Sequence, residues 1–112
     1  MEFKPFVKKL YDISGVKEEG RAYVIKTGVE AQLVGSSFSR MLKGVVTNGE
    51  EHSDEEEVFF GLKGKAKIYL DNVPYDVEEG NVVFVPKNVH HRWEAITDEF
   101  EYLCICAYFG RG

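Results

Sequence analysis

Residues 57–86, EVFFGLKGKAKIYLDNVPYDVEEGNVVFVP, contain four short apolar runs that are separated by turn residues. In the second run, Ala66, Ile68 and Leu70 alternate with more polar side chains, which is the period of a strand with one buried face. The stretch has no 3.6-residue period of the kind that marks a long helix. It therefore predicts a succession of short β-strands.

The same pattern extends on both sides of this stretch. Strands are predicted at residues 22–26, 37–46, 57–62, 65–70, 73–77, 82–86, 91–97 and 100–109. The segments 63–64, 71–72, 79–81 and 98–99 carry Gly, Asn or Asp and are read as reversals, which predicts three successive hairpins. About eight strands at this spacing predict a sandwich or a barrel.

One predicted strand differs from the others in its pattern. Residues 82–85 are apolar at every position, so both faces of this strand need cover. We expect it to lie in the interior or beneath a partner.

Residues 1–20 are predicted to form an N-terminal arm. They include Phe3, Phe6, Val7, Leu10 and Ile13, which suit either an edge strand or a short helical turn. Because an exposed apolar arm is a liability, we expect the arm to contact a second copy of the chain in a homodimer. Residues 21–112 are expected to form a single domain, since 112 residues with 44% hydrophobic content supply one core and not two.

Charge and composition exclude several classes of function. The net charge of −5 comes from 14 basic residues scattered among 19 acidic ones, whereas nucleic-acid binding needs clustered cations. No apolar run approaches the roughly 20 residues that span a bilayer, and no signal-type apolar segment follows the N-terminal lysines. A cytoplasmic protein without nucleic-acid or membrane partners is expected. Cys104 and Cys106 lie two apart on one predicted strand, where they cannot pair, so they are read as reduced thiols.

The three histidines occur in two short blocks. His52 lies in Glu50–Glu57, where six of eight residues are acidic, and His90-His91 follows Pro86 closely. Imidazole is the side chain that ligates metals or moves protons near neutral pH. If the fold brings the two blocks together, they form a site.

The spacing of these blocks matches a known pattern. The first has Glu50, His52, Glu57 and Gly64; the second has Gly80, Pro86, Asn88, His91 and Ala95. Together they resemble the two signature motifs of the cupin superfamily, with His52, Glu57, Gly64, Gly80, Pro86 and His91 at matching positions. The resemblance implies a single-domain cupin whose residues 21–112 form a double-stranded β-helix, the jelly-roll barrel.

Three positions depart from the family pattern. Glu50 stands where the family has its first histidine, Asn88 replaces a glycine, and Ala95 replaces an asparagine. Asn tolerates left-handed backbone geometry better than most residues, so the second change is mild. The first concerns function, although a carboxylate at that position still ligates a metal.

The resemblance implies a divalent-metal site made by Glu50, His52, Glu57 and His91. Residues two apart on an extended strand face the same way, so Glu50 and His52 both point into the barrel. Such a ligand set suits Fe²⁺, Mn²⁺, Zn²⁺ or Ni²⁺ without distinguishing them. A second register pairs His52 with Asp54, but it leaves a shorter gap before Glu57 than the family pattern has.

Other residues near the motifs are further candidates for the site or its surroundings. Trp93 shares its strand face with His91, so it either lines a substrate pocket or packs in the core, and Arg40 is considered as an anion anchor inside the barrel. His90 must point away from His91 and is read as a surface or rim residue. Glu51, Glu55 and Glu56 are read as solvated loop residues.

These features favour a metal-dependent cupin that acts on a small organic molecule by oxygenase-type or isomerase-type chemistry. Fold alone does not choose the reaction. A non-catalytic small-molecule-binding or sensor cupin that has lost its metal chemistry is the alternative, which the changes at Glu50 and Ala95 favour slightly. A storage or purely structural role fits less well with so small a chain.

Overall fold

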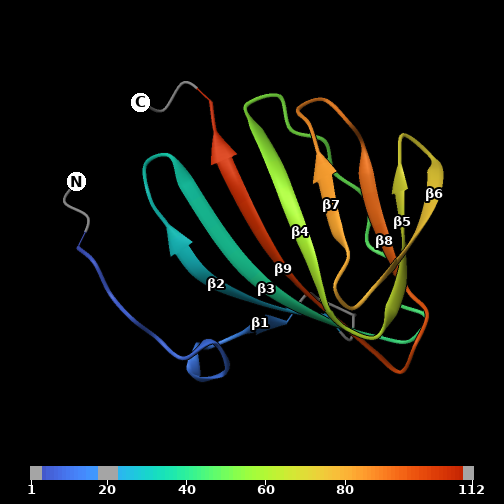
Figure 1. Ribbon diagram of the computed structural model, residues 1–112, viewed down its shortest axis with the longest axis horizontal. Coiled ribbons are helices and arrows are strands. Elements are labelled where there is room, and N and C mark those ends of the chain that lie inside the picture. The colour runs from blue at the N-terminus through green and yellow to red at the C-terminus, as the bar shows by residue number, and fades with distance from the viewer. Residues whose placement is uncertain (1–3, 18–22, 110–112) are drawn as a thin grey trace.

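The computed structural model describes residues 4–17 and 23–109, which form two antiparallel β-sheets facing each other (Figure 1). The larger sheet has the order β1-β2-β3-β9-β4-β7 and the smaller one the order β6-β5-β8. The strands are β1 (Val16–Lys17), β2 (Tyr23–Glu30), β3 (Val34–Leu42), β4 (Glu55–Lys63), β5 (Lys65–Leu70), β6 (Val73–Glu78), β7 (Val82–Val85), β8 (His91–Ala95) and β9 (Glu99–Tyr108). The predicted all-β jelly roll is confirmed, with sheets that do not close completely.

The N-terminal arm contains both of the structures considered for it. A 3-10 turn covers Leu10–Asp12 and the short strand β1 follows. The ring of Tyr11 packs edge-on against Phe38 of β3 with centroids 5.5 Å apart, while residues 4–9 are exposed along their whole length. Figure 1 shows this exposed part running away from the sheets. Phe3 and residues 18–22 lie outside the described residues.

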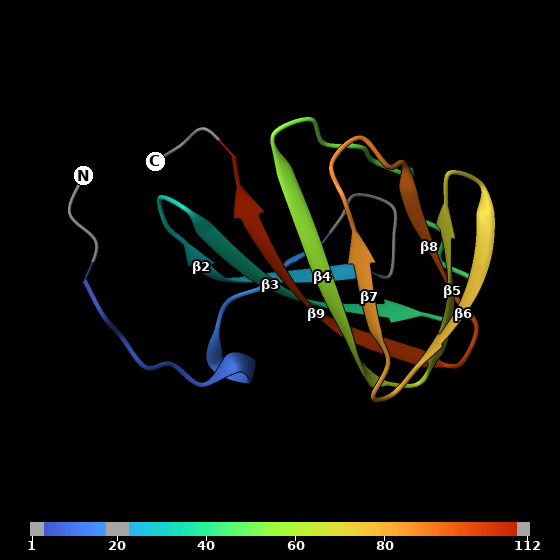
Figure 2. The ribbon, with the colours of Figure 1, turned by 45° about the horizontal axis from the view of Figure 1, so that its top comes forward.

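The prediction of three successive hairpins was wrong. Of the four predicted reversals, only the turn at Asp71-Asn72 joins two paired strands, β5 and β6, and both residues have left-handed φ angles of 48° and 68°. The turns at 63–64, 79–81 and 98–99 instead carry the chain from one sheet to the other (Figure 2). Gly64 is one such corner: its φ is +77°, and a Cβ there would collide with the Glu99 carbonyl.

The strand of apolar residues 82–85 does not lie in the interior. It forms β7, at one edge of the larger sheet, with Val85 buried but Val82 and Phe84 exposed by 62% and 54%. An apolar pattern on both faces cannot distinguish a buried strand from one whose outer face is left for a partner. Within the described residues, the outer face of β7 has no cover.

Several strand boundaries also differ from prediction, among them the end of β2, which runs to Glu30, and both ends of β3. β3 begins earlier, at Val34, and ends at Leu42, because Gly44 adopts a left-handed turn with φ 83°. Residues 44–50 then run alongside β8, held by backbone hydrogen bonds such as Thr47 N–H to the Trp93 carbonyl at 3.0 Å. This irregular segment carries the first sequence block to the smaller sheet.

The core lies between the two sheets. Met41, Ile68 and Phe100 are completely buried, and Ala66 and Ile68 point inward from β5 as the alternating pattern predicts. Aromatic rings fill the centre: Trp93 stacks on Tyr102 with centroids 4.9 Å apart and contacts Phe100 at 5.1 Å. The strands emerge from this core toward an open end, where β4 begins and β9 ends (Figure 2).

Candidate metal centre

Backbone pairing brings the two histidine blocks together at the open end of the barrel. Glu50 and His91 exchange two hydrogen bonds, with N···O distances of 2.9 and 2.8 Å, and the His52 carbonyl accepts from Asn88 N–H at 2.7 Å. Asn88 has φ 67°, so the residue that replaces the family glycine does adopt left-handed geometry. Glu57 arrives separately, from the inner face of β4, beside these residues.

Four side-chain atoms of these residues lie close together. Glu57 Oε1 is 3.3 Å from His52 Nε2 and 3.2 Å from His91 Nε2, and Glu50 Oε2 is 3.2 Å from His52 Nε2. Ligand atoms that bind one ion at about 2.1 Å are about 3.0 to 3.4 Å apart in tetrahedral or octahedral arrangements. These three contacts therefore have the spacing of neighbouring ligands in a metal coordination shell.

Glu57 supplies the clearest sign that something is to be bound. Its Oε1 is completely buried and accepts no hydrogen bond in the described part of the chain, although it faces His52 Nε2 and His91 Nε2 at 3.3 and 3.2 Å. A buried acceptor without a partner costs about 1 to 3 kcal/mol. A cation at this point would satisfy the atom, so the residues present fit a metal.

Burial is graded across the cluster. The side chains of His91 and Glu57 are 6% and 11% exposed, His52 is 26% exposed, and Glu50 is 68% exposed. Three of the four residues are thus largely buried, and Glu50 lies on the solvent side of the site, which is open. An open side of this kind leaves room for water or a small molecule.

The contact between Glu57 and His91, the two most buried residues of the cluster, favours the charged form of each side chain. Burial opposes ionisation of Glu57, but close contacts with His91 and Cys104 outweigh burial and hold the pKa of Glu57 below its usual value. Burial likewise disfavours protonated His91, but the Glu57 carboxylate overcomes this and raises the pKa of His91. A carboxylate held ionised beside an imidazole is a ready cation ligand.

Further contacts orient the cluster residues. The Cys104 thiol donates a hydrogen bond to Glu57 Oε2 at 3.2 Å, leaving Oε1 to face the histidines. Burial and the neighbouring carboxylate raise the pKa of the Cys104 thiol, so it remains a protonated donor. His91 Nδ1 lies 3.4 Å from the Val89 carbonyl, and His52 Nδ1 lies 3.6 Å from Glu55 Oε1. Partners of this kind on the second ring nitrogen leave Nε2 free to ligate.

Sequence reasoning missed Glu55 and Cys104. Glu55 was read as a solvated residue, yet its side chain is only 16% exposed and faces His52. Its position two residues before Glu57 on the same strand was a usable signal, because both then share the inner face. Cys104 had no such signal, since only the β4–β9 register places it opposite Phe59 and near Glu57. Both cysteines are free thiols, as expected.

The alternative register receives no geometric support. Asp54 is exposed, and the groups of described residues with metal-like ligand spacing are Glu50, His52 and His91, and His52, Glu55 and Glu57. His52 belongs to both groups, whereas Glu57 and His91 are joined by the 3.2 Å contact between Glu57 Oε1 and His91 Nε2. Asp54 belongs to neither group.

Arg40 does not point into the barrel. It lies opposite Glu101, which alternates with the core residues Phe100 and Tyr102 and therefore faces outward. Arg40 Nε donates to Glu101 Oε2 at 2.8 Å, on the face that the N-terminal arm covers through Tyr11. Sequence position alone did not reveal which face of β3 the residue occupies.

The remaining assigned residues lie near the cluster without joining it. Trp93 is 2% exposed in the aromatic core below His91, and its Nε1 is buried with no hydrogen-bond partner among the described residues. His90 is half-buried next to Gly49, and its backbone N–H donates to Asp71. Neither residue is in a group with metal-like spacing.

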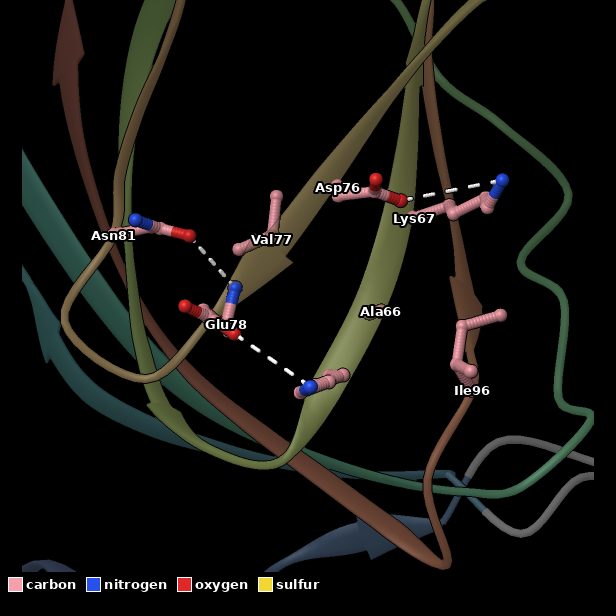
Figure 3. Close-up of a pocket in the computed structure, with 8 residues that line it drawn as sticks. Ala66, Lys67, Asp76, Val77, Glu78, Asn81 and Ile96 are labelled. Carbon is pink, nitrogen blue, oxygen red and sulfur yellow. Dashed lines mark hydrogen bonds and ion pairs between the residues drawn. The ribbon is translucent and has the colours of Figure 1, made fainter.

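A separate surface hollow lies along β5 and β6 (Figure 3). Its charged residues pair with one another: Lys65 lies 3.9 Å from Glu78, and Lys67 lies 4.0 Å from Asp76. The Asn81 side-chain oxygen accepts from the Glu78 backbone. Because these exposed groups are matched in charge, the hollow offers less chemistry than the cluster at the barrel mouth.

Two facing antiparallel sheets with histidines and carboxylates gathered at their open end define a jelly-roll protein with a candidate metal centre. Residues 38–108 match the cupin domain, so this chain belongs to the cupin family. Within the described residues, no helix has the length and apolar character to cross a membrane.

Individual relatives agree with this assignment. The uncharacterized protein MJ1618 of Methanocaldococcus jannaschii is 28% identical over 58 residues, which cover 52% of this chain and 46% of that protein. The chain spans about half the length of the curated relatives that it matches.

Two solved structures share the fold. KdgF from Halomonas sp. superposes with a TM-score of 0.86 at 10% identity, covering 94% of both chains. A predicted oxalate decarboxylase from Thermotoga maritima has a TM-score of 0.85 at 13% identity, covering 93% of this chain and all of that one (100%). At these identities the likeness concerns the fold alone.

Proposed function

We propose that this cupin binds a divalent transition metal through Glu50, His52, Glu57 and His91 and acts on a small organic molecule at the barrel mouth. The observation that carries the proposal is the buried Glu57 Oε1, which lacks a hydrogen bond and lies 3.2 to 3.3 Å from two imidazole nitrogens. Family membership supports it, since cupin neighbours include a predicted oxalate decarboxylase.

The ligand set indicates the class of metal. Two imidazoles with two carboxylates suit Fe²⁺, Mn²⁺, Zn²⁺ or Ni²⁺, and the two negative charges offset the charge of the ion. When bound, such an ion supplies Lewis-acid, water-activating or redox chemistry. The protein's own part is orientation: Cys104 donates a hydrogen bond to Glu57, the Val89 carbonyl lies 3.4 Å from His91 Nδ1, and Glu55 faces His52 Nδ1 at 3.6 Å.

A non-catalytic binding or sensor role is the second candidate. It is favoured by the packing beneath the cluster, where Phe59, Trp93, Phe100 and Tyr102 fill the barrel and are at most 4% exposed. A molecule bound here has access to the rim of the barrel and not to its depth. Metal binding is common to both candidates, and turnover distinguishes them.

Replacing Glu50 by alanine tests the ligand set. We expect Glu50→Ala to weaken Mn²⁺ or Zn²⁺ binding by on the order of 10-fold or more, because one of four ligands is lost. The affinity is measured by calorimetric titration of metal-free protein. Asp54→Ala, which removes a neighbouring exposed carboxylate outside the cluster, is the matched control and should leave affinity unchanged. Equal affinities for the two variants would contradict the proposed ligands.

We also propose that the protein is a cytoplasmic homodimer. Val82, Phe84 and Ile105 are exposed apolar residues on the outer face of the larger sheet: Phe84 and Ile105 both lie opposite Val58, and Val82 lies opposite Phe60. The arm is anchored on this same face by Tyr11, yet its Val7 is completely exposed. Its six exposed residues span up to roughly 20 Å, enough to cover these apolar residues on a second copy. The free thiols fit a reducing compartment.

Removing the arm tests the dimer. A chain lacking residues 1–12, and separately the variant Phe84→Asp, are expected to elute as monomers in size-exclusion chromatography with light scattering, while the intact protein elutes as a dimer. Tyr75→Asp places the same charge at an equally exposed position on the smaller sheet and should leave the dimer intact. An unchanged mass after removal of the arm and in Phe84→Asp would overturn the proposal.

A further inference from the structure

The inner wall of the barrel mouth is acidic beyond the four proposed ligands. Glu55 lies 3.6 Å from His52 and opposite Tyr108 in the β4–β9 register. Tyr108 shares the inner face of β9 with Cys104 and Cys106, and its hydroxyl donates to Glu30 Oε1 at 3.0 Å. Carboxylates thus lie on the inner face at β4, beside the metal cluster, and at β2, with Tyr108 of β9 reaching from one side toward the other.

Basic side chains of the surrounding described strands are engaged elsewhere. Arg40 pairs with Glu101 on the outer face, and Arg92 stacks over Tyr69 at 3.8 Å on the smaller sheet. Lys87, on the turn after β7, has its ammonium over the ring of Phe109. The charged neighbours that act most strongly on Glu55 and Glu57 are histidines and other carboxylates.

The charge balance follows from these positions. A divalent ion is offset by Glu50 and Glu57, so the two further carboxylates, Glu55 and Glu30, outnumber the single ammonium of Lys87 among the side chains described above. Carboxylate and phosphate groups are ordinarily recognised by Arg or Lys, through charge-assisted hydrogen bonds. This mouth instead presents hydrogen-bond acceptors, which suit hydroxyl, amide or ammonium donors.

We infer that the molecule taken by this site is neutral or cationic and carries hydroxyl or nitrogen donors, and that carboxylates and phosphates are disfavoured. The inference rests on the proposed metal site, whose unpartnered Glu57 Oε1 marks it as a binding site independently of the acidic wall. This preference for neutral or cationic molecules distinguishes the chain from a protein whose ligand is a dianion such as oxalate.

Three probes of similar size test the charge preference: glycolate, glycolamide and glycinamide, which are anionic, neutral and cationic at pH 7. With protein in excess over Mn²⁺, the broadening of each probe's methylene proton signal reports binding beside the ion. We expect stronger broadening for glycinamide and glycolamide than for glycolate. Glu30→Gln and Glu55→Gln should each raise the relative affinity for glycolate on the order of 3- to 5-fold, as removal of one nearby charge predicts.

Glu79→Gln is the matched control, since it removes an exposed carboxylate at the turn between β6 and β7, outside the acidic wall, and should change nothing. A preference for glycolate, or no difference among the probes and no response to the variants, would overturn the inference. The Mn²⁺ electron paramagnetic resonance signal reports metal binding separately. If Mn²⁺ stays free, the proposed function fails and the inference fails with it; if Mn²⁺ binds and glycolate is preferred, only the inference fails.

Discussion

Replacing His91 by alanine is expected to reduce metal affinity by on the order of 100-fold or more, the largest effect of any single change at the site. His91 is the most buried of the four proposed ligands, and its Nε2 lies 3.2 Å from Glu57 Oε1. The substitution removes a ligand and also leaves the Glu57 carboxylate buried without its principal counter-group, which weakens the remaining shell. Calorimetric titration of metal-free protein with Zn²⁺ or Mn²⁺ measures the change.

His90→Ala is the control for this prediction. The two histidines are adjacent in sequence, but His90 belongs to no group with metal-like spacing. Its removal should leave metal affinity within about 2-fold of the original, as expected for a residue outside the ligand shell. Loss of affinity in His90→Ala with none in His91→Ala would show that the wrong histidine has been assigned.

Replacing Phe100 by alanine is expected to lower the free energy of unfolding by about 3 to 5 kcal/mol, because a fully buried aromatic ring leaves a cavity that its neighbours fill only in part. Phe100 is 0% exposed and contacts both Trp93 and Tyr102. Urea denaturation of the metal-free protein measures this directly. The loss is a large share of the roughly 5 to 15 kcal/mol that is typical of the unfolding free energy of a domain. Partial unfolding of Phe100→Ala at about 37 °C would therefore also agree with the prediction.

Phe109→Ala provides the comparison for the core variant. Phe109 is 43% exposed at the end of the described chain, so its removal should cost no more than about 1 kcal/mol. Equal losses in the two variants would contradict the account of an aromatic core between the sheets.

The fold class was predictable because its signals are local. The alternation at 65–70 and the frequent turn residues depend only on neighbouring positions, and both indicated strands that the structure contains. The pairing of those strands was not predictable in the same way. Asp71-Asn72 and Lys63-Gly64 both reverse the chain, but one closes a hairpin and the other crosses between sheets, and turn chemistry does not distinguish these cases.

The residues of the candidate site were also predictable only where the signal was local in the sequence. His52, Glu57 and His91 were found from motif spacing, and the structure places their side-chain atoms together. Cys104 and the outward orientation of Arg40 depend on the registers of β9 with β4 and β3, which are set by long-range packing. The role of Glu55 was not predicted because it lies in a run of acidic residues, and such runs usually mark solvent-exposed loops.

The metal content of the protein tests the central claim most directly. Protein purified without an affinity tag is analysed by inductively coupled plasma mass spectrometry, as isolated and after reconstitution with Fe²⁺, Mn²⁺, Zn²⁺ and Ni²⁺ followed by removal of excess ion. A site made by Glu50, His52, Glu57 and His91 predicts close to one equivalent of at least one of these metals per chain, and its loss in His91→Ala. Less than about a tenth of an equivalent of every metal, before and after reconstitution, would contradict the account, since a shell of four such ligands binds divalent transition metals.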